Sequence, residues 1–140
     1  KKIAFTNGCF DILHVGHVRY LKEAKKTTGI LVLALNSDTS VQAIKGAKRP
    51  LVSEEERAEV LAALACIDFV TIFNELTPLE LICYLKPDVL IKGGDWPEDK
   101  VVGRDEIKKW GGHVTIIPEV AGKSTTNIVD KIISSYCSGS

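Results

Sequence analysis

Short runs of almost uniformly apolar residues alternate with stretches of helical character along this chain. The apolar runs lie at residues 3–6, 30–35, 69–73, 89–91 and 114–117. Strands that are apolar on both faces are typical of a parallel sheet covered by helices, because neither face then meets water. The regular alternation predicts a single α/β domain, with a Rossmann-like, doubly wound parallel five-stranded sheet and helices on both faces.

The stretches between the runs carry helix signals. Val15, Val18, Leu21 and Ala24 recur at helical spacing. Other signals are a capping-box pattern at Ser53, a Pro expected at the first helical position at residue 78, and a Gly pair that ends a helix at 111–112. We expect helices at residues 15–27, 53–64, 77–85, 104–110 and 124–133, a domain spanning 1–133, and a flexible tail at 134–140.

Composition restricts the partners of the chain. Lys+Arg and Asp+Glu number 18 each, so no net field attracts nucleic acid or an anionic membrane. No apolar run approaches the roughly 18 residues of a membrane span. Cys9, Cys66, Cys83 and Cys137 contain no CxxC pair, which favours reduced thiols in a cytoplasm over a zinc site or disulfides. The absence of Met, even at position 1, predicts a segment cut from something longer.

Unusual residues gather where the predicted strands end. They form four segments, at residues 7–17, 36–38, 92–96 and 118–126. In an open parallel sheet, ligands bind beyond the carboxyl ends of the strands. The four segments therefore predict one cleft at that edge of the sheet.

The first of these segments joins the first strand to the first helix. Gly8 allows a tight turn there, and a helix N-terminus favours phosphate through its unpaired N–H groups and its dipole. His14 and His17 lie three residues apart, so both imidazoles point the same way and can grip phosphate oxygens as charge develops. We expect Gly16, between them, to keep that face open for a nucleotide.

These residues resemble the HxGH signature of the nucleotidylyltransferase superfamily. The match consists of residues 8–11 (GCFD), residues 14–17 (HVGH) and the Ser/Thr-rich start of a late helix at 122–128 (GKSTTNI). Within the superfamily the chain is most similar to heptose 1-phosphate adenylyltransferases, which occur alone or as the C-terminal half of a fusion with a sugar kinase. That similarity rests on residues 5–11, 36–38, 44–46 with 49–50, 91–95 and 124–128.

The resemblance implies transfer of AMP from ATP to heptose 1-phosphate, giving ADP-heptose and pyrophosphate. It implies a cytoplasmic homodimer and Mg²⁺ bound mainly through the triphosphate, with no dedicated metal site in the protein. The attacking phosphate is already anionic, so positioning and charge neutralisation carry the reaction.

The resemblance also implies a role for each site residue. The catalytic set is His14, His17 and Lys45. The nucleotide-binding set is Asn7, Gly8, Cys9, Phe10, Gly16, Lys92, Gly94, Asp95, Ser124, Thr125 and Thr126. The substrate-binding set is Asp11, Asn36, Asp38 and Arg49. Alternatives remain at five places. Asp11 orients the loop, contacts substrate or has a structural hydrogen-bonding role; Lys45 either reaches the phosphates or is a solvated surface lysine; and Arg49 either binds the sugar phosphate or is a helix-flanking charge. Asp95 either contacts ligand or caps a helix, and the hydroxyls at 124–126 can cap a helix as well as bind phosphate.

Three other functions compete with this interpretation. A CTP-dependent cytidylyltransferase acting on glycerol 3-phosphate or a similar alcohol phosphate is less favoured, because residues 118–122 lack the Arg-Thr pair that some of those enzymes carry. An NAD-binding oxidoreductase is disfavoured because no G-x-G-x-x-G follows the first strand. A non-catalytic nucleotide sensor could share the fold, but the two histidines argue against it.

Overall fold

The sheet has five parallel strands in the order β3-β2-β1-β4-β5. A computed structural model of the chain describes residues 1–94, 97–119 and 123–137. The strands are β1 (Ile3–Gly8), β2 (Ile30–Asn36), β3 (Phe69–Phe73), β4 (Val89–Gly93) and β5 (His113–Ile117). All five predicted strands are therefore confirmed, and β1 and β4 each extend two residues beyond the predicted run.

The strand order reverses beside β1. The chain builds β1, β2 and β3 outward in one direction, then returns to place β4 on the other side of β1, with Ala4 paired to Val89 and Phe5 to Leu90. The loops that follow β1 and β4 diverge to opposite faces there, which opens a crevice at the carboxyl ends of the two strands.

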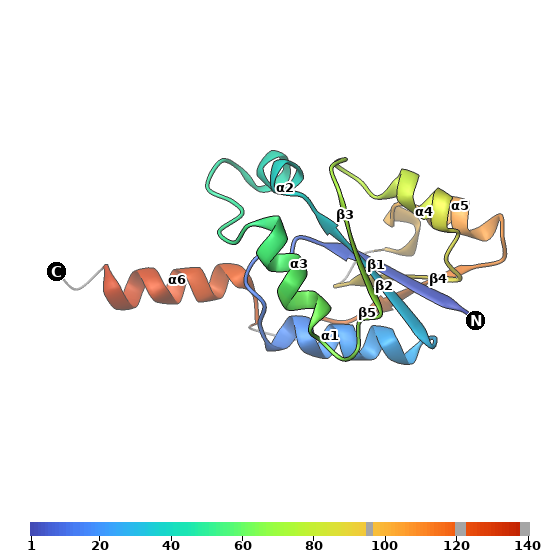
Figure 1. Cartoon of the computed structure of the whole chain (residues 1–140), viewed down its shortest axis with the longest axis horizontal. Helices are drawn as coiled ribbons and strands as arrows, with labels where there is room; N and C mark the ends of the chain where they lie inside the picture. Colours follow the sequence, from blue (N-terminus) through green and yellow to red (C-terminus); the bar gives the residue numbers. More distant parts are fainter. Residues whose placement is uncertain (95–96, 120–122, 138–140) are drawn as a thin grey trace.

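Helices cover both faces of the sheet, as the apolar strands predict (Figure 1). On one face, Leu21 and Ala24 of α1 (Val15–Lys26) and Leu61 of α3 (Glu54–Ala62) pack on the sheet. On the other, Ile82 of α4 (Leu79–Leu85) and Ile107 of α5 (Arg104–Lys108) do so. Because β2 is buried from Leu31 to Asn36, it forms the centre of both cores.

The helix predictions hold in outline and differ at their ends. Ser53 caps α3 by accepting the Glu56 N–H at 3.4 Å, which is one half of the expected capping box. Pro78 is the N-cap of α4 instead of its first residue, and α5 ends at Lys108, two residues earlier than expected. The structure adds α2 (Asp38–Lys45), in a segment for which no helix was predicted, and a short 3-10 helix, η1 (Glu98–Lys100).

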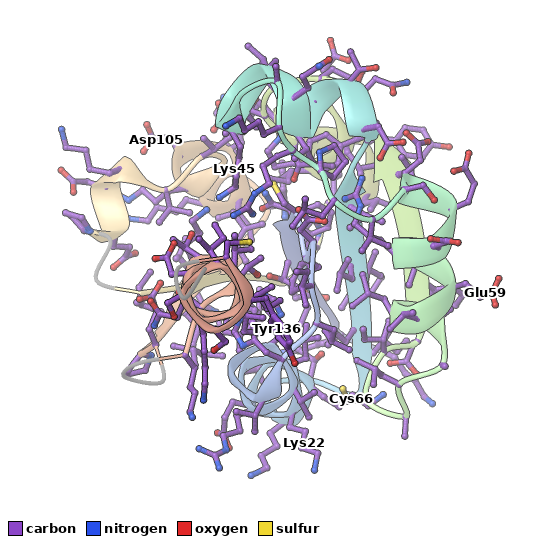
Figure 2. All side chains as sticks on the ribbon, turned by 90° about the vertical axis from the view of Figure 1, so that its left-hand side faces the viewer. Lys22, Lys45, Glu59, Cys66, Asp105 and Tyr136 are labelled. Atoms are coloured by element: carbon purple, nitrogen blue, oxygen red, sulfur yellow. The ribbon has the colours of Figure 1, made fainter. Side chains whose placement is uncertain are left out.

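The last helix, α6 (Thr125–Tyr136), projects away from the sheet beyond the carboxyl ends of the strands (Figure 1). It has no buried residue. It also runs three residues past 133, so residues 134–136 are helical where a flexible tail was expected, and residues 138–140 lie outside the described part of the chain. Figure 2 looks onto this edge of the sheet with α6 seen end-on.

Candidate active site

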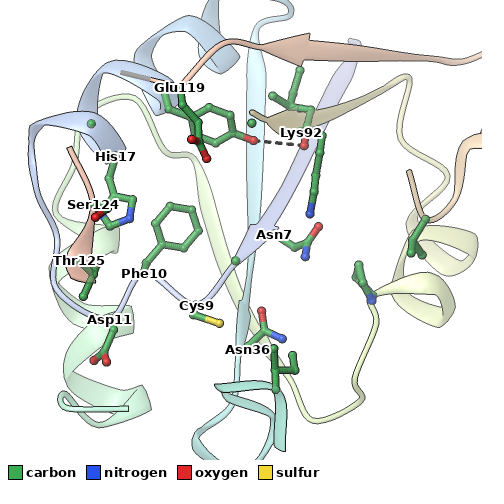
Figure 3. A pocket seen from close by; sticks show the side chains of 18 of the residues that line it. Asn7, Cys9, Phe10, Asp11, His17, Asn36, Lys92, Glu119, Ser124 and Thr125 are labelled. Carbon is green, nitrogen blue, oxygen red and sulfur yellow. Dashed lines mark hydrogen bonds between the residues drawn. The ribbon is translucent and has the colours of Figure 1, made fainter. Parts of the chain in front are cut away.

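A cleft of about 650 Å³ opens at the strand ends, where the sequence predicts it. The predicted site residues that line it are Asn7, Gly8, Cys9, Phe10, Asp11, His14, Gly16, His17, Asn36, Lys45, Arg49, Lys92, Ser124, Thr125 and Thr126. Asp38 and Gly94 do not line it, and Asp95 lies outside the described residues. Figure 3 shows side chains from the β1 loop, β4 and α6 converging on this space.

The two histidines are fixed by hydrogen bonds at the start of α1. His14 is the N-cap, and its Nδ1 accepts the Gly16 N–H at 3.1 Å. The His14 N–H donates in turn to Nδ1 of His17 at 3.2 Å. The rings are stacked with centroids 3.8 Å apart. Because each Nδ1 accepts a hydrogen bond, each neutral ring carries its proton on Nε2, which remains to donate to a ligand in the cleft.

Both histidines are held in the neutral form. Burial, followed by the nearness of His14, lowers the pKa of His17 to about 4. Burial, followed by the charge of Lys123, lowers the pKa of His14. The pair therefore meets a ligand at neutral pH as two uncharged Nε2–H donors, and proton transfer is not needed for their function.

The low pKa of His17 makes stability depend on pH. In the unfolded chain this residue binds a proton below a pKa of 6.5, whereas in the folded chain it stays neutral down to about 4. The unfolded state thus holds more protons in this window, and the free energy of unfolding falls as the pH drops through it. We expect the Tm to fall over that range less steeply in His17→Gln than in the unmodified chain. Thermal melts across the range measure both slopes, and equal slopes would contradict the assignment.

Two glycines shape the histidine side of the cleft. A Cβ at Gly8 would lie 2.7 Å from the Phe10 ring, which packs against His17 at a centroid distance of 5.0 Å. A Cβ at Gly16 would lie 2.8 Å from the His14 ring. The His14 imidazole packs where a side chain at residue 16 would lie, and Gly16 itself lines the cleft, so its role in leaving a face open for a nucleotide stays a prediction.

The Asp11 carboxylate is engaged by its own chain. Oδ1 accepts the N–H groups of Leu51 and Val52 at 2.9 Å, and Oδ2 lies 3.6 Å from Nη1 of Arg49. Asp11 is 6% exposed. These contacts give Asp11 a structural hydrogen-bonding role, one of the interpretations that the sequence left open: it ties the loop after α2 to the β1 loop and lies beside Arg49. Contact of Asp11 with substrate stays a prediction, since Asp11 also lines the cleft.

Asp38, which was predicted to bind substrate, is not among the residues that line the cleft. Its side chain accepts a hydrogen bond from Nη2 of Arg57 at 2.8 Å, away from the cleft lining. Asn36 does line the cleft, and its amide donates to the Ser40 hydroxyl at 2.9 Å. The partner of Asp38, Arg57, was not singled out from sequence, because one arginine in an acidic helix start carries no distinguishing pattern.

Gly94, which was predicted to bind nucleotide, is also not among the residues that line the cleft. Its neighbour Gly93 lines the cleft instead, with the Tyr20 ring 3.1 Å from where a Cβ would lie. Gly94 has a φ of +95° and donates its N–H to the Ile117 carbonyl at 2.9 Å. It therefore serves the turn that leaves β4, a conformation that residues with a side chain rarely adopt.

Lysines supply the positive charge of the cleft. Lys45 ends α2 at the cleft mouth, and Lys92 projects from β4 into the space around Asn7 (Figure 3). Burial lowers the pKa of Lys92 and raises the pKa of the Cys9 thiol. A raised thiol pKa gives no support for a nucleophilic cysteine, in agreement with the expectation that Cys9 contributes backbone.

The start of α6 closes the remaining side. The Ser124 hydroxyl caps the helix by accepting the Asn127 N–H at 3.0 Å, and the Thr125 hydroxyl donates to the Ile12 carbonyl at 3.4 Å. Capping is thus confirmed, and the helix N-terminus opens into the cleft, where it can also receive phosphate.

Other residues that line the cleft were absent from the predicted site, among them Tyr20, Glu119 and Lys123. Tyr20 donates to the Ile91 carbonyl at 3.2 Å, and burial raises its pKa to about 12. Its place under β4 depends on the strand order and could not be read from local spacing.

Two features are absent from the described residues: a cluster of metal-ligating side chains and a membrane-spanning helix. Across residues 1–94, 97–119 and 123–137, no group of three or more His, Cys, Asp or Glu side chains is placed to hold a metal ion. In the same residues, none of the helices combines the length and the apolar character that crossing a membrane requires.

Comparison with known sequences gives consistent matches. The family model described as cytidylyltransferase-like matches residues 5–138. The bifunctional protein HldE of Geobacter metallireducens is 60% identical over 136 residues, which is 97% of this chain and 28% of that protein. The HldE protein of Syntrophotalea carbinolica is 55% identical over 139 residues, or 99% of this chain and 28% of that protein. The chain thus spans between a quarter and a third of the relatives that it matches.

Solved structures agree with the fold. A lipopolysaccharide core biosynthesis protein from Thermoplasma volcanium superposes with a TM-score of 0.70 at 28% identity, covering 85% of this chain and 96% of the other. Pantothenate synthetase from Thermus thermophilus gives a TM-score of 0.57 at 14% identity, covering 86% of this chain and 56% of the other. The second match concerns the fold alone.

Proposed function

Because the chain belongs to the cytidylyltransferase-like family, we propose that it transfers AMP from ATP to heptose 1-phosphate, releasing pyrophosphate and ADP-heptose, a precursor for lipopolysaccharide or surface glycans. The observation that carries the transfer chemistry is the pair of neutral histidines at the α1 N-terminus, each with Nδ1 engaged and Nε2–H available. The choice of acceptor rests on the sequence resemblance to heptose 1-phosphate adenylyltransferases and on the identity with HldE proteins.

The histidine pair acts on the triphosphate. The Nε2–H groups of His14 and His17 donate to phosphate oxygens as charge moves from the α-phosphorus to the departing pyrophosphate. The N-terminus of α6, with Ser124 and Thr125, receives the β- and γ-phosphates on its N–H groups and hydroxyls. Both helix ends are fixed by their caps before ligand arrives, so little reorganisation is needed in the reaction.

The side of the cleft that carries Arg49 and Lys45, here called the acceptor wall, binds the acceptor phosphate. Arg49, held by Asp11, receives the sugar phosphate, and Lys45 bridges toward the triphosphate. The acceptor phosphate oxygen forms the new bond to the α-phosphorus, and the bond from that phosphorus to the bridging oxygen of pyrophosphate breaks. Since the acceptor oxygen is already anionic, the cleft needs no general base, and positioning supplies about 7–11 kcal/mol of the barrier reduction.

Magnesium fits this cleft as an ion carried by the nucleotide. The two carboxylates among the described lining residues are Asp11, whose oxygens accept backbone N–H groups, and Glu119, which would contact the hydrated ion. When bound with the nucleotide, Mg²⁺ would neutralise charge that develops on the phosphates. The lysines, histidines and helix ends hold the remaining phosphate oxygens.

The wider protein is also part of the proposal. The shared 28% of the HldE relatives supports a fusion in which this domain is joined to a sugar kinase. Free thiols at Cys9, Cys66 and Cys83 suit a cytoplasmic location. We infer a homodimer from the family resemblance alone.

Assays with different pairs of nucleotide and acceptor distinguish this function from that of a CTP-dependent cytidylyltransferase. We expect pyrophosphate release from ATP with heptose 1-phosphate, and only background release from CTP with glycerol 3-phosphate. A coupled pyrophosphate assay over both nucleotides and both acceptors gives four rates. If the CTP and glycerol 3-phosphate pair turns over instead, the heptose assignment fails while membership of the family stands.

A further inference from the structure

Arg57 is the largest of the fully buried side chains, although it is charged. It lies on α3 and is 2% exposed. Nε donates to the Val52 carbonyl at 2.9 Å, and Nη1 donates to the carbonyls of Cys9 at 2.7 Å and Asn36 at 2.9 Å. With the contact from Nη2 to the Asp38 carboxylate, one guanidinium joins three segments of the chain, through three backbone carbonyls and one side chain.

Each of these segments leads to the acceptor wall. Cys9 lies in the loop that carries Asp11, and Asn36 ends β2 at the cleft. Asp38 begins α2, whose last residue is Lys45. Val52 follows the loop that carries Arg49 and receives a second contact from Asp11. Arg57 and Asp11 thus form a closed ring of contacts, the Arg57–Asp11 clamp, which fixes this wall to the β1 loop.

Stability alone is a poor explanation for this arrangement. A buried charge pays a desolvation cost, and a well-packed apolar side chain often stabilises a fold equally well. What the guanidinium adds is a rigid planar fork that sets the directions of its hydrogen bonds. A lysine has a single flexible ammonium and cannot reproduce that geometry, so it serves as a sensitive test of positioning.

The triphosphate side is anchored separately. His14 and His17 are held by contacts within the first turn of α1, and α6 is held by the contact from Thr125 to Ile12. Neither set of contacts includes the Arg57 guanidinium. Loss of the clamp therefore affects one half of the cleft.

We propose that Arg57 is a positioning residue that sets the affinity for the acceptor phosphate, and not for the nucleotide, by holding the wall that carries Arg49. The inference rests on the proposed function, which assigns the acceptor phosphate to that wall. Arg57 does not line the cleft, so its effect passes through Asp11, Arg49 and the backbone it binds.

Steady-state kinetics of Arg57→Lys test the proposal. We expect the KM for heptose 1-phosphate to rise about tenfold, the loss typical of one well-placed charge-assisted hydrogen bond. The KM for ATP should change by less than about twofold, within the spread of independent sites. A general loss of folded protein would not change one of these KM values relative to the other. Equal rises in both KM values, or a lower Tm with unchanged kinetics, would overturn the inference.

Two further variants keep the test decisive. Asp38→Asn removes the charge of the carboxylate that accepts from Nη2 and leaves an amide oxygen in its place. The Asp38 side chain is 43% exposed, so we expect this variant to fold even if Arg57→Lys does not, and to shift the same KM in the same direction. Arg104→Lys is the matched control, since Arg104 is paired with Asp105 outside the cleft lining, and both KM values should stay unchanged.

Amide hydrogen exchange gives a readout that does not depend on turnover. The N–H groups of Leu51 and Val52 donate to Asp11 within the clamp, so both should exchange faster in Arg57→Lys and not in Arg104→Lys. Unchanged exchange would show that Arg57 does not hold this loop. If the unmodified protein shows no turnover with ATP and heptose 1-phosphate, the proposed function fails, while the exchange rates still decide whether the clamp exists.

Discussion

Replacing His17 with alanine is expected to lower kcat by about 10²–10³-fold, the usual cost of removing one preorganised donor from a developing oxyanion. His17 contributes an Nε2–H in a half-buried position, fixed through Nδ1 by the backbone N–H of His14. Alanine removes the donor and leaves the helix intact, so the protein should still fold. Single-turnover pyrophosphate release at saturating ATP measures the loss, and circular dichroism checks the fold.

Two variants make this result specific. His113→Ala removes the third histidine, which is exposed at the start of β5 outside the cleft lining, and should leave kcat unchanged. His17→Gln offers an amide N–H near the position of Nε2, and should recover part of the lost rate. Full activity in His17→Ala would remove His17 from the catalytic set.

The strands and the position of the cleft could be predicted because the relevant signals are local. Each strand is a continuous apolar run, and the rule for open parallel sheets places ligands at the strand ends. The family assignment from residues 8–17 and 122–128 is confirmed by the cytidylyltransferase-like match over residues 5–138. The spacing of residues within a short motif does not depend on the rest of the fold, so such motifs can be recognised in the sequence.

Helix α2 was missed for a physical reason. Its sequence, DTSVQAIK, is rich in residues that lose side-chain freedom in a helix or compete for its backbone hydrogen bonds. It is stabilised by a local cap, in which the Ser37 hydroxyl accepts the Ser40 N–H at 3.1 Å, and by a tertiary contact, in which the Ser40 hydroxyl donates to the Glu75 carbonyl at 2.9 Å. The second contact joins residues that are distant in the sequence, so no local pattern predicts it.

The Arg57–Asp11 clamp could not be predicted from the sequence for the same reason. Arg57 reaches Cys9 across 48 positions, and Asp11 reaches Leu51 across 40. The resemblance assigned Asp38 to substrate, and in the structure its carboxylate accepts a hydrogen bond from Arg57. Which polar residue faces the cleft is decided by packing partners, and these become visible only with the strand order.

Substituting alanine for Gly16 should lower kcat by about a hundredfold, the loss expected when a catalytic group is displaced by about 1 Å. An added Cβ would lie 2.8 Å from Cε1 and 3.0 Å from Nδ1 of His14, and 3.2 Å from Cβ of Lys123. The imidazole must move, which breaks the Gly16 to His14 hydrogen bond and unstacks the ring from His17. Alanine is a better helix former than glycine, which offsets part of the clash in the free energy of unfolding. The Tm should therefore change little while turnover falls.

Gly29→Ala is the matched control for that variant, because an added Cβ there meets no atom within 4 Å and the position is exposed. It should retain full turnover. Pyrophosphate release and thermal melts on both variants separate a displaced histidine from lost structure. If Gly16→Ala keeps the activity of Gly29→Ala, the His14 ring either tolerates the displacement or has no part in the reaction, and the neutral donor pair reduces to His17 alone. A fall in turnover with the Tm maintained would instead assign the glycine of the HxGH motif to the placement of its first histidine.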